Sequence, residues 1–129
     1  MKKNILIVDD DANTRQLLTA CLQQEGFAVV TAENGTEALG RFIYSLFTKP
    51  FSLILLDVVI PQPDGLAVLE IIRKEEAARG IPYGEGVPII VLTGHKDTCM
   101  DSFNKGCDDY MIKPVKTADL VSKVRSKIK

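Results

Sequence analysis

Five short apolar runs alternate with longer stretches of helical periodicity along the 129 residues of the chain. The runs are NILIV (4–8), FAVVT (27–31), LILLD (53–57), PIIVL (88–92) and DYMI (109–112). Apolar runs of this length suit strands that are covered on both faces, and strands that alternate with helices form parallel sheets. Right-handed crossovers leave few topologies. The sequence therefore predicts an α/β fold with a parallel sheet and helices on both of its faces.

The stretches between the runs carry start and stop signals of helices. We predict helices that begin near Ala12, Thr36, Asp64, Asp97 and after Pro114. Asp11 and Asp64 are predicted as caps of the first and third helix. The second helix is expected to bury Ala38, Leu39, Phe42, Ile43 and Leu46. Three glycines and a proline predict an exposed loop over 80–87.

Composition limits the class of protein. The net charge is -1 and 46% of the residues are hydrophobic, which fits one soluble globular domain over residues 1–129. No apolar run approaches the ~20 residues of a membrane span, and the first residues do not resemble a secretion signal. Scattered basic residues indicate no direct nucleic-acid binding. Three cysteines without a C-x-x-C pair favour a reducing cytosol, so we expect a cytoplasmic protein.

Polar side chains follow the apolar runs where each predicted strand ends. The first run is followed by Asp9 and Asp10, the third ends in Asp57, the fourth is followed by Thr93, and the fifth by Lys113. Open α/β sheets place their chemistry at this carboxyl edge. Clustered carboxylates repel one another unless a cation neutralises them, and an oxygen-only cluster suits Mg²⁺ better than Zn²⁺. With a hydroxyl and an ammonium nearby, a phosphoryl group is the expected ligand.

Four motifs together resemble the receiver domain of two-component response regulators of the chemotaxis-regulator type. They are ILIVDDD, LILLDVVIPQPDG, PIIVLTG and GCDDYMIKP, and they occur in the order of that family. The resemblance covers essentially the whole chain. It implies a flavodoxin-like fold of five parallel strands in the order 2-1-3-4-5. It also implies a signalling role as a phosphoacceptor switch rather than an enzyme.

The resemblance assigns the acidic residues. Asp57 resembles the aspartate that accepts a phosphoryl group from a sensor histidine kinase or a histidine phosphotransfer protein. Asp10 and Asp57 resemble direct Mg²⁺ ligands, with Asp9 holding a metal-bound water and the Val59 backbone carbonyl as a further ligand. His95, two residues beyond Thr93, and Val59 are hypothesised to tune autodephosphorylation.

The remaining assignments concern the switch. Lys113 resembles the lysine that pairs with the phosphoryl oxygens, and the Lys113–Pro114 bond resembles one that is cis in the family. Thr93 resembles the hydroxyl that moves to bond the phosphoryl group, and Tyr110 the aromatic residue that turns inward with it. The expected output surface comprises the fourth helix, the fifth strand and the last helix. The downstream protein target, and whether phosphorylation drives dimerisation, are left open by the sequence.

A different class also has a partial match, the haloacid-dehalogenase-like phosphatases. In that interpretation Asp9 is the nucleophile, Asp11 the acid/base, Lys113 the lysine, and Asp108 and Asp109 a metal pair. The acidic pair should follow the lysine but here precedes it, and Asp57 would have no role. A flavin-binding module on the same fold lacks the phosphate-binding loop after the first strand.

Overall fold

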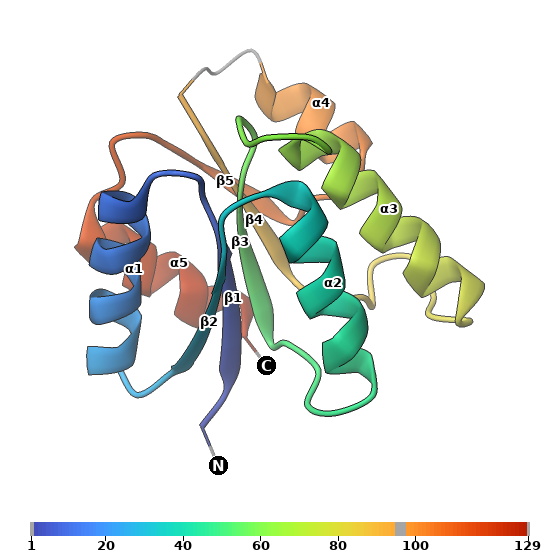
Figure 1. The fold of residues 1–129 in the computed structure, drawn as a ribbon, viewed down its shortest axis with the longest axis horizontal. Helices are drawn as coiled ribbons and strands as arrows, with labels where there is room; N and C mark the ends of the chain where they lie inside the picture. The colour runs from blue at the N-terminus through green and yellow to red at the C-terminus, as the bar shows by residue number, and fades with distance from the viewer. Residues whose placement is uncertain (1, 95–97, 129) are drawn as a thin grey trace.

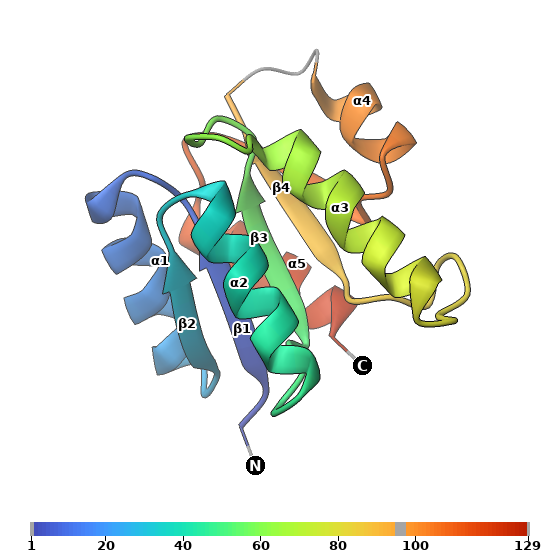
Figure 2. The ribbon, with the colours of Figure 1, turned by 45° about the vertical axis from the view of Figure 1, so that its right-hand side comes forward.

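The computed structural model describes residues 2–94 and 98–128, and it shows a five-stranded sheet between two layers of helices (Figures 1 and 2). All neighbouring strands are parallel, and their order is β2-β1-β3-β4-β5. The predicted fold class and the implied strand order are confirmed. The elements are β1 (Asn4–Val8), α1 (Ala12–Gln24), β2 (Ala28–Ala32), α2 (Gly35–Leu46), β3 (Leu53–Asp57), α3 (Gly65–Ala78), β4 (Ile89–Thr93), α4 (Thr98–Asn104), β5 (Asp109–Ile112) and α5 (Thr117–Lys127).

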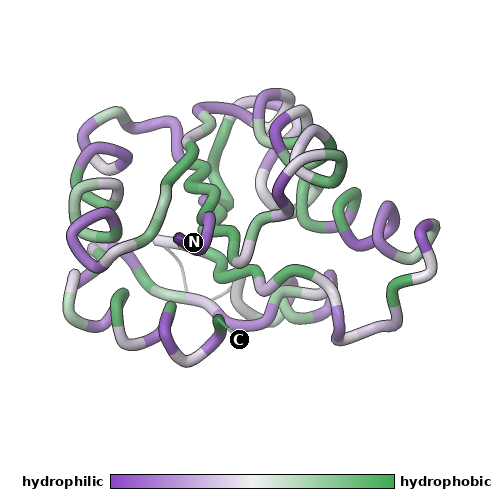
Figure 3. Tube along the Cα trace, turned by 90° about the horizontal axis from the view of Figure 1, so that it is seen from below, coloured by the Kyte–Doolittle hydropathy of each residue, from purple (hydrophilic) through white to green (hydrophobic). Residues whose placement is uncertain are grey.

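The sheet separates two apolar cores. Successive side chains of a strand point to opposite faces, so Leu56 packs with α2 and α3 while Leu55 packs with α1 and α5. The ribbon shows α1 and α5 on one side of the sheet and α2 and α3 on the other (Figure 1). Seen from below, the strands between the helices are largely apolar (Figure 3). None of the helices in the described ranges has the length and apolar character that a bilayer span requires.

Three helices are capped by a polar side chain just before their first residue. Asp11 accepts a hydrogen bond from the Asn13 amide, Asn34 from the Glu37 amide, and Asp64 from the Ala67 amide, at 3.1, 2.7 and 2.9 Å. Such caps stabilise a helix by about 1 kcal/mol each. The predicted caps Asp11 and Asp64 are confirmed. The predicted start of the fourth helix at Asp97 lies outside the described residues.

The predicted buried face of α2 is wrong at one position. Ile43 is 37% exposed, whereas Ala38 and Phe42 are buried as predicted. Ser45 takes the inward position three residues after Phe42, and its hydroxyl donates to the Phe42 carbonyl at 2.6 Å. The buried face therefore follows the 38, 42, 45 spacing, which turns Ile43 outward.

Two predicted strands start one residue too early. The Phe27 amide donates to the Leu22 carbonyl at 3.1 Å, so Phe27 completes the end of α1 rather than beginning β2. Pro88 has no amide hydrogen to donate, and β4 begins at Ile89. The other strand starts, at Asn4, Leu53 and Asp109, are as predicted.

The loop over 79–88 is anchored through a buried glutamate. Glu76, in α3, is 5% exposed and accepts the Val87 amide at 2.7 Å. Arg73 donates to Glu76 at 2.6 Å and to Asp108 at 2.8 Å. A Cβ at Gly86 would lie 2.1 Å from a Glu76 carboxylate oxygen, so only glycine permits this approach. The loop is held at the amino-terminal edge of the sheet, where β4 begins.

Candidate functional site

The carboxyl ends of β1, β3 and β5 bring four of the predicted side chains together. The Lys113 ammonium lies 2.8 Å from an Asp57 carboxylate oxygen and 3.0 Å from one of Asp9. One carboxylate oxygen each from Asp9, Asp10 and Asp57 lie within 4.8 Å of one another. Asp9 and Asp57 are buried and Asp10 is exposed, so the cluster opens to solvent on one side.

The chain turns sharply after Asp57, and a glycine makes the turn possible. The Val59 amide donates to the Asp57 carboxylate at 3.0 Å, and the Gly65 amide donates to the Val58 carbonyl at 2.9 Å. A Cβ at Gly65 would lie 2.2 Å from the Asp57 carbonyl oxygen. The start of α3 therefore packs directly against the backbone of Asp57 and holds that residue in place.

A second close contact supports the turn over 58–64 from the side. The Gly35 amide, at the start of α2, donates to the Pro61 carbonyl at 3.2 Å. A Cβ at Gly35 would lie 1.8 Å from the Pro63 carbonyl oxygen. The Gln62–Pro63 and Lys113–Pro114 peptide bonds are both cis, the second as the resemblance implies.

Burial and the neighbouring charges act in opposite directions on the two central groups. Burial raises the pKa of the Asp57 carboxyl above its ordinary value, although hydrogen bonds from Lys113 and the Val59 amide lower it, and the Asp9 charge adds to the increase. Burial lowers the pKa of Lys113, but its hydrogen bonds to Asp57 and Asp9 prevail and the pKa is raised. Lys113 therefore stays charged at neutral pH. Further positive charge at the cluster would favour the ionised Asp57.

The donor atoms of the acidic cluster fit Mg²⁺. All three residues offer carboxylate oxygens, and among the residues that the structure describes neither cysteine nor histidine joins the group. Mg²⁺ prefers one or two carboxylates together with water and other oxygen ligands, which agrees with a cluster that is open on the side of Asp10. The chemistry of the cluster thus matches the magnesium site that the sequence predicts.

The predicted switch residues lie on β4, which pairs with β3, and on the edge strand β5 beyond it. Thr93 ends β4 and is 1% exposed, and its backbone carbonyl accepts the Lys113 amide at 2.8 Å. Tyr110, in β5, is half-buried, and its ring meets that of Phe103 edge to face at 5.7 Å between centroids. Val59 is 68% exposed beside Asp57. His95 lies outside the described residues.

The acidic pair that a phosphatase would require is not part of this cluster. Asp108 accepts the Ile89 amide at 2.8 Å at the start of β4, which is the opposite edge of the sheet. Asp11, the proposed acid/base of that class, accepts from Asn13 and Thr14 as the cap of α1. Asp9 and Lys113 lie together, but Asp108, which that chemistry would need as a metal ligand, is at the other edge of the sheet.

Arg15 is not among the residues predicted from the sequence, yet it contacts the site. Its guanidinium donates to the Asp9 backbone carbonyl at 2.7 Å and lies 3.6 Å from the Glu33 carboxylate. The available signal is its position one turn after the cap Asp11, because long side chains in a helix point back toward the amino terminus. Its partners could not be identified from the sequence alone.

The chain resembles known response regulators in sequence and in structure. The family model of the response regulator receiver domain matches residues 5–125. The probable transcriptional regulator ycf27 of Porphyra purpurea is 38% identical over 128 residues, covering 97% of this chain and 47% of that protein. The DNA-binding response regulator MtrA of Mycobacterium tuberculosis is 36% identical over 131 residues, covering 100% of this chain and 52% of that protein. The chain thus spans about half the length of these curated relatives.

The solved structures include a CheY-like response regulator receiver domain protein from Methanospirillum hungatei. It superposes with a TM-score of 0.79 at 31% identity, covering 98% of this chain and 94% of that one. The same family is indicated by the acidic cluster with its lysine, by the strand order and by the family model. The chain belongs to the family of response regulator receiver domains.

Proposed function

We propose that Asp57 accepts a phosphoryl group from the phosphohistidine of a sensor histidine kinase or a histidine phosphotransfer protein, and that this modification is the signal. The observation that carries the proposal is the position of the Asp57 carboxylate. It is buried at the centre of the carboxyl edge, with Lys113 at 2.8 Å and two further carboxylates within 4.8 Å. A pocket of this kind accommodates a charged, oxygen-rich group only when cations balance it.

The acidic residues would hold the metal in different ways. Asp10 and Asp57 would bind Mg²⁺ directly, Asp9 through a water molecule, and Val59 through its backbone carbonyl. When bound, the ion supplies positive charge that offsets the carboxylates and the oxygens of the transferring group. The three carboxylate oxygens lie within 4.8 Å of one another, close enough to surround one ion together with water.

The transfer requires the protein to position and neutralise the reacting groups. An ionised Asp57 oxygen attacks phosphorus in line, the new phosphorus–oxygen bond forms, and the phosphorus–nitrogen bond to the imidazole of the donor breaks. Lys113 moves from its carboxylate partners to the phosphoryl oxygens, so its charge stays within the pocket. Because the pKa of Asp57 is raised, cation binding also favours the ionised form of this nucleophile.

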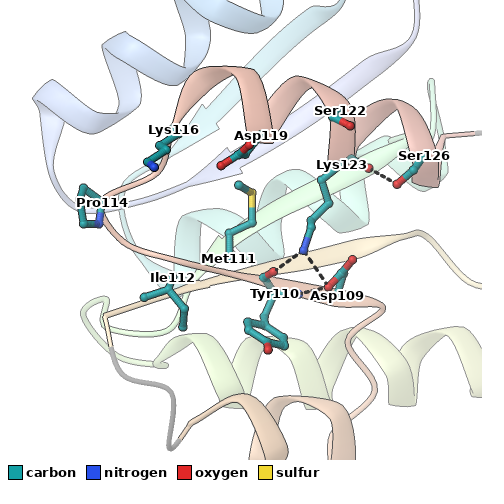
Figure 4. A pocket seen from close by; sticks show the side chains of 10 residues that line it. All are labelled: Asp109, Tyr110, Met111, Ile112, Pro114, Lys116, Asp119, Ser122, Lys123 and Ser126. Atoms are coloured by element: carbon teal, nitrogen blue, oxygen red, sulfur yellow. Dashed lines mark hydrogen bonds and ion pairs between the residues drawn. The ribbon is translucent and has the colours of Figure 1, made fainter.

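Phosphorylation changes the surface formed by α4, β5 and α5. The phosphoryl group brings up to about two negative charges next to Thr93. The Thr93 hydroxyl then moves to donate a hydrogen bond to a phosphoryl oxygen, and the Tyr110 ring turns inward. Tyr110 already contacts both flanking helices, through the Phe103 ring and through the Lys123 ammonium 5.7 Å from its own ring centroid. An open pocket of about 610 Å³ lies between β5 and α5, and Tyr110 and Lys123 are among its lining residues. Figure 4 shows these side chains. A downstream protein would dock on this surface.

The energy of the switch indicates that the partner takes part in it. Moving an equilibrium from about 1:99 to 99:1 requires roughly 5.5 kcal/mol of differential stabilisation. A hydrogen bond from Thr93 to a charged phosphoryl group contributes only about 1.5–3 kcal/mol. Binding of the downstream partner therefore completes the change.

The central test is phosphoryl uptake. The protein is incubated with Mg²⁺ and acetyl phosphate, and its intact mass is measured, with beryllofluoride binding followed by NMR in parallel. Uptake of one phosphoryl group that is lost in Asp57→Asn is the expected result. Phosphorylation that persists in Asp57→Asn and disappears in Asp9→Asn would favour the phosphatase chemistry instead. No uptake by the wild-type protein would overturn the proposal.

Val59 and His95 are proposed to tune the lifetime of the phosphorylated state. Val59 is exposed next to Asp57, where an apolar side chain would hinder the attacking water. We expect Val59→Asn to shorten the lifetime and His95→Ala to change it. Equal lifetimes of both variants and the parent would exclude the hypothesis.

A further inference from the structure

Arg15 connects the first turn of α1 to the end of β1. Its side chain is 18% exposed, and one guanidinium nitrogen donates to the Asp9 backbone carbonyl at 2.7 Å. The other terminal nitrogen lies 3.6 Å from Glu33, in the segment between β2 and α2. Because Glu33 is 61% exposed, this ion pair contributes little energy, and the hydrogen bond to the Asp9 carbonyl is the main contact of the guanidinium.

The hydrogen bonds around Asp10 explain what Arg15 can do. Asp10 is exposed, so packing does not hold its side chain. The peptide unit before it is held by Arg15 through the Asp9 carbonyl, and the peptide unit after it by the Asp11 amide, which donates to the Asp9 carboxylate at 2.9 Å. The two soft torsions of a residue rotate against its flanking peptide planes. With both planes held, the direction in which the Asp10 Cα–Cβ bond leaves the backbone is determined.

We propose that Arg15 is a positioning residue for the magnesium site. Its hydrogen bond to the Asp9 carbonyl directs the Asp10 carboxylate toward Asp57, so that the two can bind one ion. This inference rests on the proposed Mg²⁺-dependent phosphorylation of Asp57. Arg15 touches neither the ion nor the phosphoryl group and acts only through the backbone of the two acids.

The charge and the geometry of Arg15 make opposite predictions. A guanidinium repels a metal cation, so removal of the charge alone would strengthen Mg²⁺ binding. Loss of the hydrogen bond frees the Asp9–Asp10 peptide unit and weakens Mg²⁺ binding. Removal of groups that orient metal ligands weakens metal affinity by about 10–100-fold. The sign of the change in affinity therefore identifies the role of Arg15.

The test compares Mg²⁺ affinities by isothermal titration calorimetry and by amide NMR shifts. Arg15→Met removes both the donors and the charge, and we expect its dissociation constant for Mg²⁺ to rise about tenfold or more. Arg15→Lys keeps the charge and a donor, so it should recover part of the affinity. Phosphoryl uptake by Arg15→Met should return toward that of the parent at saturating Mg²⁺, because the nucleophile itself is untouched.

Arg41 provides a matched control. Its guanidinium donates to the backbone carbonyl of Thr31, near the end of β2, at 2.8 Å, and it lies 3.6 Å from Glu37. The chemistry is the same as that of Arg15, but none of these residues belongs to the acidic cluster. Arg41→Met should leave the Mg²⁺ affinity unchanged. Thermal unfolding without Mg²⁺ verifies that each variant is folded.

The outcomes separate this inference from the proposed function. Equal or tighter Mg²⁺ binding by folded Arg15→Met, in a protein whose wild type binds Mg²⁺, overturns the positioning role. Slow phosphorylation of Arg15→Met at every Mg²⁺ concentration, together with wild-type Mg²⁺ affinity, overturns that role as well. Wild-type protein that binds Mg²⁺ but takes up no phosphoryl group overturns the proposed function alone. Wild-type protein that binds no Mg²⁺ overturns both.

Discussion

Replacement of Lys113 by methionine leaves two buried carboxylates without the positive charge that they share. The Asp9 side chain is fully buried and that of Asp57 is 5% exposed, whereas Lys113 is 29% exposed. Removal of one partner from a buried ion pair destabilises a protein by about 3–5 kcal/mol. The partial exposure of Lys113 places the expected loss near the lower end, at about 3 kcal/mol. Methionine keeps the length of the side chain, so the change is mainly one of charge and hydrogen bonding.

The loss is large enough to measure by thermal unfolding. A chain of 129 residues has an unfolding entropy of about 270 cal/mol/K, at about 2.1 cal/mol/K for each residue. A loss of about 3 kcal/mol then lowers the melting temperature by roughly 11 °C. Differential scanning calorimetry in Mg²⁺-free buffer at pH 7 gives this value directly.

The dependence of this stability loss on pH and on Mg²⁺ identifies its cause. Lys113 lowers the pKa of Asp57 through its hydrogen bond, so its removal raises that pKa further above the unfolded value of 3.8. The folded state then binds this proton more tightly than the unfolded state, and stability falls as pH rises through the interval between the two pKa values. The difference in stability between wild type and Lys113→Met should therefore narrow as the pH falls toward 4. It should also narrow on addition of Mg²⁺, which replaces the missing charge.

Lys123→Met serves as the control for this prediction. Lys123 pairs with Asp109 at 3.2 Å, but both side chains are more exposed, at 33% and 24%, so its loss should cost at most about 1 kcal/mol. The reasoning is refuted if Lys113→Met loses no more stability than Lys123→Met. It is also refuted if neither pH nor Mg²⁺ changes the stability difference between Lys113→Met and wild type.

Four other variants test separate parts of the site and the fold. Asp57→Asn replaces a buried carboxyl of raised pKa by a neutral group, so its melting temperature without Mg²⁺ at pH 7 should rise; a decrease would contradict the assigned cause. Gly65→Ala should lower stability by about 1–3 kcal/mol and suppress phosphoryl uptake in intact-mass measurements, because its Cβ would lie 2.2 Å from the Asp57 carbonyl oxygen. Gly40→Ala, with no atom within 4 Å of its Cβ, should instead add about 0.5–1 kcal/mol. Gly86→Ala should displace the loop from Glu76 and speed its cleavage by trypsin or chymotrypsin, and an unchanged cleavage rate would argue against the anchor.

Much of the fold and the centre of the site could be predicted because they follow from local pattern and one topological rule. The bounds of β1 and β5 agree with the apolar runs, and Asp9, Asp57 and Lys113 each stand at or just after the end of a run. Parallel strands bring such residues to one edge without any knowledge of packing. The cluster was therefore predictable as a set of residue types at strand ends.

The residues that hold the site could not be predicted in the same way. Arg15 finds the Asp9 carbonyl, and Glu76 finds the Val87 amide, only after the chain has packed. A partial signal exists for Glu76, since it continues the buried Val68–Ile72 stripe of α3 at helical spacing. Ile43 gave a misleading signal, because an apolar residue beside a buried helical stripe can face either way.

The site residues come from two parts of the sheet that differ in how often they open locally. Asp9 directly follows β1 and Asp57 ends β3, and these strands pair with each other in the interior of the sheet. Lys113 instead follows the edge strand β5 and is 104 residues from Asp9. Edge elements open locally more often than interior ones. Brief detachment of β5 would therefore carry the ammonium away and leave the paired acids in register. Amide hydrogen exchange should accordingly be faster at Met111 than at Leu55.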